Sequence, residues 1–111
     1  IAELHHHYMR PQENGNHTRV RWLEATGSFG TLRADDVTGD LLGFTAWPYT
    51  QEVLDAAEHI HELTFTERVT LNIDRQQRGV GGDIPGIAAL LPAYRMPAGQ
   101  PQEVSMRLSV R

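Results

Sequence analysis

Apolar and polar residues alternate along several short stretches of this chain, and a period of two is typical of strands with one buried face. The main stretches are residues 18–25, 31–34, 64–74 and 103–111, and residues 41–47 form a further, mostly apolar strand. Turns rich in glycine and proline separate them. The pattern predicts six or more short strands, which argue for a mainly antiparallel β-sandwich.

Residues 50–63 have helical rather than alternating periodicity. Thr50 can act as an N-cap, because its hydroxyl can accept a hydrogen bond from the first turn. Val53, Ala57 and Ile60 recur at helical spacing, which predicts one buried face. We therefore expect one short helix among the strands.

Length and composition limit the classes of function. The chain has 111 residues, so residues 1–111 form a single domain or a fragment of one. A formal net charge of −4 with no basic patch predicts no nucleic-acid partner. The absence of cysteine excludes disulfides and thiolate metal sites. No apolar run is long enough to cross a bilayer, so we expect a soluble protein without a membrane partner, either cytoplasmic or periplasmic.

Histidines form two clusters of candidate metal ligands. His5, His6 and His7 would point to alternating faces of a strand, so at most two could converge on one ion. A solvated or residual tag segment is therefore preferred to a zinc site. His59 and His61 lie two apart, and such positions on a helix point in different directions. We predict no metal site and no cofactor in this chain.

The most distinctive stretch is residues 69–86. Its strand ends in Gly79, Gly81 and Gly82, and three glycines in four positions indicate positive φ or a very close approach by another segment. Asp83 follows as the one charged side chain that the turn could aim. Two interpretations stay open, an ordinary turn with a solvated aspartate and a loop shaped to face a site.

Three segments carry a family resemblance when they are taken together. Residues 71–83 read LNIDRQQRGVGGD, residues 10–16 read RPQENGN and precede Arg21-Trp22, and residues 48–63 contain PYT and further matches. They resemble the C-terminal part of the small-chain domain of the large β-galactosidases of glycoside hydrolase family 2. The matches follow the family order from about Tyr8 to Gly99, so the resemblance implies part of a β-galactosidase supersandwich.

The chain departs from that family at one informative position. In the family, the glycine run leads into a D-S-W-G element, whose tryptophan stacks on sugar in the active site of a neighbouring barrel. Aligned without gaps, this tryptophan falls on Gly86, within Ile84-Pro85-Gly86. The resemblance therefore implies the fold without that stacking platform.

Residues 10–16 are polar and turn-like, and Arg21 follows them in a strand. Charges in mostly apolar surroundings are usually paired, so we predict that Glu13 pairs with Arg21 and pins this loop. Direct sugar contact by Glu13 or Asn14 is the alternative, since carboxylates and amides bind hydroxyl groups well.

The resemblance implies a non-catalytic piece of an enzyme that hydrolyses terminal β-D-galactosyl residues. The catalytic glutamates of the family lie on a (β/α)8 barrel of about 250 residues, which 111 residues cannot contain. We expect the chain to be inactive alone, with no catalytic residue of its own. Its glycine loop would form one wall of the site for the galactoside, and the partner would be the rest of the β-galactosidase chain. The residues of that loop are Gly79, Gly81, Gly82, Asp83 and Gly86.

A fragment of a larger sandwich has unpaired sheet edges, and such edges recruit strands. We therefore expect a homo-oligomer or sheet contacts between copies. The alternative functions are a stand-alone carbohydrate-binding module and a purely structural module. Binding modules use exposed aromatic platforms, whereas most aromatics here lie in patterns that predict burial. Exposure of Trp47 beside Tyr49 would favour a binding module, and burial of both would count against it.

Overall fold

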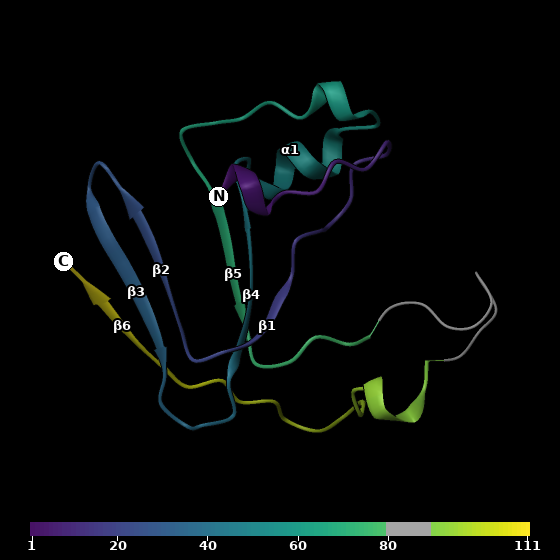
Figure 1. Cartoon of the computed structure of the whole chain (residues 1–111). Coiled ribbons are helices and arrows are strands. Elements are labelled where there is room, and N and C mark those ends of the chain that lie inside the picture. The colour runs from purple at the N-terminus through teal and green to yellow at the C-terminus, as the bar shows by residue number, and fades with distance from the viewer. Residues whose placement is uncertain (80–89) are drawn as a thin grey trace.

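The computed structural model describes residues 1–79 and 90–111. In these residues the chain forms six strands in two three-stranded antiparallel sheets, with one short α-helix. Figure 1 shows the helix and the first 3-10 turn at one end of the β1-β4-β5 sheet. The predicted mainly β class is confirmed, and the arrangement is consistent with a β-sandwich.

The elements have the following bounds: η1 (Ala2–Leu4), β1 (His17–Val20), β2 (Trp22–Gly27), β3 (Gly30–Asp36), β4 (Leu42–Trp47), α1 (Gln51–Ala56), η2 (Ile60–Glu62), β5 (Thr70–Asp74), η3 (Pro92–Tyr94) and β6 (Met106–Val110).

One sheet has the strand order β1-β4-β5 and the other has the order β2-β3-β6. β2 and β3 form a hairpin that closes where Gly27 lies opposite Gly30. Gly30 has a φ of +120°, and a Cβ at this position would collide with the carbonyl oxygen of Arg111. Glycine is therefore required at the end of this turn.

The two sheets approach each other through apolar faces. An apolar space of about 200 Å³ between them is lined by Leu23 of β2, Phe44 and Ala46 of β4, and Leu71 of β5, among others. Leu23 and Ala46 are buried. Residues of both sheets therefore line one apolar space, an arrangement consistent with the layers of a sandwich.

The strand predicted over residues 18–25 is two strands in different sheets. β1 ends one residue before Arg21, and β2 begins at Trp22. The expected burial of most aromatics is wrong: Tyr8, Phe29, Phe65 and Tyr94 are exposed, and Trp22 is 52% exposed. The guanidinium of Arg33 lies 4.4 Å from the centre of its ring, and this cation–π contact covers one face of the indole.

Arg33 is held over that ring by two carboxylates. Its Nη2 donates to Asp35 at 2.6 Å, and its Nη1 donates to Glu24 at 3.0 Å. The hydrogen bond from Arg33 lowers the pKa of the Asp35 carboxyl. Both carboxylates keep contact with water, so the pairs orient the side chains more than they stabilise the fold.

The main core lies where β4 ends and α1 begins. Trp47, Tyr49 and Leu54 form one buried cluster. The Thr50 hydroxyl accepts a hydrogen bond from the backbone N–H of Val53 at 3.4 Å, which confirms the predicted N-cap. The cap thus begins a helix whose Leu54 faces the two buried aromatic rings.

The helix is shorter than the predicted residues 50–63. It stops before Ala57, whose backbone is extended. The carboxylate of Glu62 accepts hydrogen bonds from the backbone N–H groups of Glu58 at 2.7 Å and His59 at 3.2 Å. These bonds begin the separate turn η2, which competes with continuation of α1. No helix of the described residues is long and apolar enough to span a membrane.

β5 begins at Thr70, so the strand predicted from residue 64 is shorter than expected. The Thr70 hydroxyl donates to the carbonyl of Tyr49 at 2.9 Å. Upstream, the backbone N–H of Thr66 donates to the carbonyl of Pro48 at 3.0 Å. Residues 64–69 therefore cross the end of β4 as a connecting segment instead of extending the ladder.

The prediction that residues 103–111 form a strand with one buried face is half correct. Residues 106–110 form β6, but Leu108 is 59% exposed and Val110 is 72% exposed. β6 is an edge strand that pairs with β3. Alternation identified the strand, but the described part of the chain does not cover its apolar side.

Two matched substitutions test this placement of the core. Leu54→Ala should lower the free energy of unfolding by about 2–4 kcal/mol, because it empties a buried position. Leu108→Ala makes the same chemical change at an exposed position and should cost less than about 1 kcal/mol. Urea unfolding monitored by tryptophan fluorescence measures both variants. Equal losses would contradict the core described here.

Candidate functional site

The predicted site-facing loop is only partly within the described residues. Gly79 is described, whereas Gly81, Gly82, Asp83 and Gly86 lie outside the described residues. The described residues near this loop are the end of β5, the segment that follows it up to Gly79, and the elements packed beside them.

Gly79 makes a close backbone contact with a segment distant in sequence. Its N–H donates to the carbonyl of Tyr94 at 3.1 Å. A Cβ at Gly79 would lie 2.7 Å from the Cβ of Tyr94, closer than real side chains approach. At this position glycine allows close approach by another chain segment, one of the two reasons that the sequence suggested.

Asn14 anchors the loop of residues 10–16. Its Oδ1 accepts from the backbone N–H of His6 at 2.8 Å, and its Nδ2 donates to the carbonyl of Gln12 at 2.9 Å. Its backbone carbonyl accepts from the indole Nε1 of Trp47 at 2.8 Å. Asn14 is itself buried, so this loop is fixed to the core by neutral hydrogen bonds.

The predicted Glu13–Arg21 ion pair does not form. Both side chains are exposed, and none of the ion pairs of the described residues joins them. Instead, the Arg21 backbone carbonyl accepts from the N–H of Asp36 at 2.9 Å. Water solvates the charges of Glu13 and Arg21. Burying the neutral amide of Asn14 costs less desolvation free energy than burying an ion pair would, so the loop is anchored by Asn14.

His5 is buried, in contrast to the prediction of a solvated histidine segment. The hydroxyl of Tyr49 lies 3.0 Å from its Nδ1, and the two rings meet edge to face. The amide Nδ2 of Asn14 also donates to this hydroxyl at 3.4 Å. Burial is the main cause that lowers the pKa of His5, with smaller effects from His7 and His6. Burial also raises the pKa of Tyr49.

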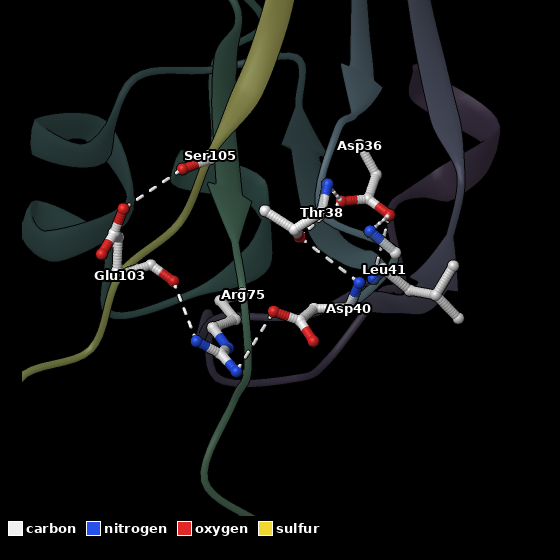
Figure 2. A network of polar contacts seen from close by, with 8 residues as sticks. Asp36, Thr38, Asp40, Leu41, Arg75, Glu103 and Ser105 are labelled. Atoms are coloured by element: carbon white, nitrogen blue, oxygen red, sulfur yellow. Dashed lines mark hydrogen bonds and ion pairs between the residues drawn. The ribbon is translucent and has the colours of Figure 1, made fainter.

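A second polar network fixes the start of β4 and the end of β5 (Figure 2). The Asp36 carboxylate accepts from three backbone N–H groups of the following turn. These bonds, that of Thr38 foremost, lower the pKa of Asp36. Arg75 then bridges two segments, with Nη2 3.3 Å from Asp40 and Nη1 donating to the carbonyl of Glu103 at 3.2 Å.

A polar hollow of about 380 Å³, whose lining includes the residue before Gly79, is the candidate binding site. It draws side chains from the anchored loop, β4, the first turn of α1, and β5 with the residues that follow it. The residues that line this polar hollow are Glu13, Asn16, Thr45, Gln51, Asn72, Asp74, Gln76, Gln77 and Arg78.

Two features of the polar hollow are informative about its chemistry. Asn72 donates through Nδ2 to the hydroxyl of the buried Thr45 at 3.1 Å, so these two lining side chains are held together. The Nδ2 of Asn16 is buried and has no acceptor among the described residues. Carboxylates, amides and a guanidinium together supply acceptors and donors for a hydroxylated ligand.

Sequence reasoning identified only part of this arrangement. Glu13 and Asn14 were weighed as sugar contacts, and the structure places Glu13 at the polar hollow and Asn14 in the core. Asn16, Asn72 and Asp74 were not predicted as site residues, although Asn72 and Asp74 are polar positions of the alternating stretch 64–74. The described residues contain no cluster of three or more side chains that could hold a metal ion.

Comparison with known proteins identifies the family. The family model described as "Beta galactosidase small chain" matches residues 1–108. The chain belongs to this family. The sequence is 33% identical over 105 residues to β-galactosidase BgaC of Bifidobacterium adolescentis, which covers 93% of this chain and 10% of that protein. It is 36% identical over 94 residues to a β-galactosidase of Priestia megaterium, covering 84% of this chain and 9% of that protein.

A β-galactosidase of Lactobacillus delbrueckii subsp. bulgaricus is 38% identical over 74 residues, which cover 67% of this chain and 7% of that protein. This small-chain family member therefore spans about a tenth or less of the length of these relatives. The resemblance inferred from RPQENGN and the glycine run is confirmed at the level of the family.

Substitutions in the loop of residues 10–16 distinguish anchoring by the hydrogen bonds of Asn14 from anchoring by a Glu13–Arg21 ion pair. Asn14→Ala should lower the free energy of unfolding by about 2–3 kcal/mol, because buried donors and acceptors lose their partners. A double-mutant cycle of Glu13→Gln and Arg21→Gln should give a coupling energy near zero. Chemical denaturation of the variants provides both values. Strong coupling between the two charges, with little effect at Asn14, would restore the ion-pair interpretation.

The buried histidine predicts a pH dependence of stability. The folded pKa of His5 is below its ordinary 6.5, so the unfolded chain takes up the proton first as the pH falls. This contribution is therefore fully present above about pH 6.5 and is lost as the pH decreases toward the folded pKa. Unfolding free energies measured between neutral and mildly acidic pH should fall less in His5→Gln than in the parent chain. His61→Gln, at an exposed site, should match the parent, and a match by His5→Gln would contradict the prediction.

Proposed function

We propose that this chain is a non-catalytic C-terminal part of a family 2 β-galactosidase, and that it forms one wall of the sugar site and supports the catalytic barrel. The observation that carries the proposal is the pattern of similarity. Relatives named β-galactosidase match most of this chain, yet the match covers only a tenth or less of each. A segment of this size is one part of a much longer enzyme.

Catalysis would belong to that longer protein. Retaining glycosidases use two carboxyl groups about 5 Å apart on a rigid frame. Glu13 and Asp74 at the polar hollow lie on different elements, one on an exposed loop and one at the end of β5. Neither is therefore assigned as acid or nucleophile, and the chain should be inactive alone.

The position of the polar hollow supports a role beside sugar. Gln77 and Arg78 line it and directly precede Gly79, where the loop predicted to face the site begins. The Asn14 hydrogen bonds and the Gly79–Tyr94 contact fix the segments on either side. A fixed wall can contribute to binding without an entropic cost for ordering it.

The alternative of a stand-alone carbohydrate-binding module has less support. Trp47 and Tyr49 are 1% and 0% exposed, so they cannot act as an aromatic platform. Trp22 is exposed, but Arg33 occupies one face of its ring. A purely structural role remains the other alternative. Association of copies through open sheet edges also remains a prediction of the sequence.

Complementation of a truncated enzyme tests the proposal. The chain is mixed with a family 2 β-galactosidase that lacks the corresponding segment, and hydrolysis of a chromogenic β-galactoside is followed. The chain alone should give no turnover, and mixing should restore activity. As a control, Leu54→Ala should restore less, in proportion to its folded fraction. No restoration by the folded chain would reject the role as a wall of the site.

A further inference from the structure

The polar hollow contains more hydrogen-bonding capacity than the described residues use. Among its nine lining side chains, only Thr45, Asn72 and Gln51 take part in side-chain hydrogen bonds of the described residues. No ion pair of the described residues uses Glu13, Asp74 or Arg78. Within the described residues, the side chains of Glu13, Asp74 and Arg78 therefore keep hydrogen-bonding capacity for a ligand.

Several of these groups are partly withdrawn from water. Asn16, Asn72 and Asp74 are half-buried, and Thr45 is buried. Polar groups that lose water without gaining a partner are costly, so this site favours an occupant that itself offers donors and acceptors.

We propose that the polar hollow is a saccharide subsite that binds a pyranose through its hydroxyl groups. Glu13 and Asp74 accept hydrogen bonds from the sugar, and Arg78 donates to it. Its volume of about 380 Å³ falls within the range of roughly 300–1,000 Å³ found for small-ligand sites. None of its lining residues is aromatic, so it recognises hydroxyl groups and not the apolar face of the ring.

The choice of a sugar as the ligand class rests on the proposed function, and the chemistry of the hollow is consistent with it. A phosphate or a polyanion would face Glu13 and Asp74 with a single guanidinium, Arg78, in compensation. An apolar ligand would leave the polar lining unsatisfied. A neutral polyhydroxylated ring avoids both costs.

Titration of the ¹⁵N-labelled chain with D-galactose, followed by two-dimensional NMR, tests the subsite. Saturable shifts should be confined to amide signals of the lining residues, including the side-chain amides of Asn16 and Asn72. Glu13→Gln and Asp74→Asn should each weaken binding about tenfold, because each removes a charged acceptor. Glu67→Gln removes an exposed carboxylate that does not line the hollow and should leave the affinity unchanged.

The spectra of the variants also report whether each one is folded, so a loss of binding cannot be confused with unfolding. Absence of saturable shifts in the folded parent chain, or equal weakening by all three variants, would overturn the subsite. Complementation and titration can fail separately. Restored activity without galactose shifts would retain the proposed function and reject the subsite, and the reverse result would retain the subsite alone.

Discussion

Asn14 uses its side-chain amide and its backbone carbonyl to join the polar loop of residues 10–16 to the aromatic core. The indole of Trp47 and the hydroxyl of Tyr49 are buried polar groups that need partners, and both find them here. A neutral amide can do this because it both donates and accepts without the desolvation cost of a charge. The same hydrogen bonds place the N-terminal segment, with His5, over the core.

The polar hollow depends on this anchoring. Because Asn14 points into the core, its neighbours Glu13 and Asn16 are left at the surface of the hollow. The opposite wall comes from β5, whose Asn72 is bonded to Thr45 of β4. The two walls of the hollow are far apart in sequence. The hydrogen bonds of Asn14 hold one wall, and the antiparallel pairing of β4 with β5 holds the other.

Residues 90–111 are connected to the rest of the molecule at a few places. Arg75 reaches the carbonyl of Glu103, Gly79 bonds to the carbonyl of Tyr94, and β6 pairs with β3. The exposed apolar side of β6 contrasts with the closely packed region around Trp47. Of these two described regions, the polar hollow adjoins the buried one, through Thr45 of β4 and Gln51 of α1.

Local sequence determined the turn of residues 27–30, the N-cap at Thr50, most strand positions and the family, because each depends on nearby residues or on contiguous motifs. Tertiary structure decided what depends on distant partners. The chain passes from one sheet to the other at Arg21, between β1 and β2. The carboxylate of Glu62 forms a separate turn after α1, and His5 is buried against Tyr49. Tertiary structure also replaced the predicted ion pair by the amide of Asn14 and brought together the residues of the polar hollow. An alternating pattern indicates that a strand has two faces, but only packing decides which face is covered.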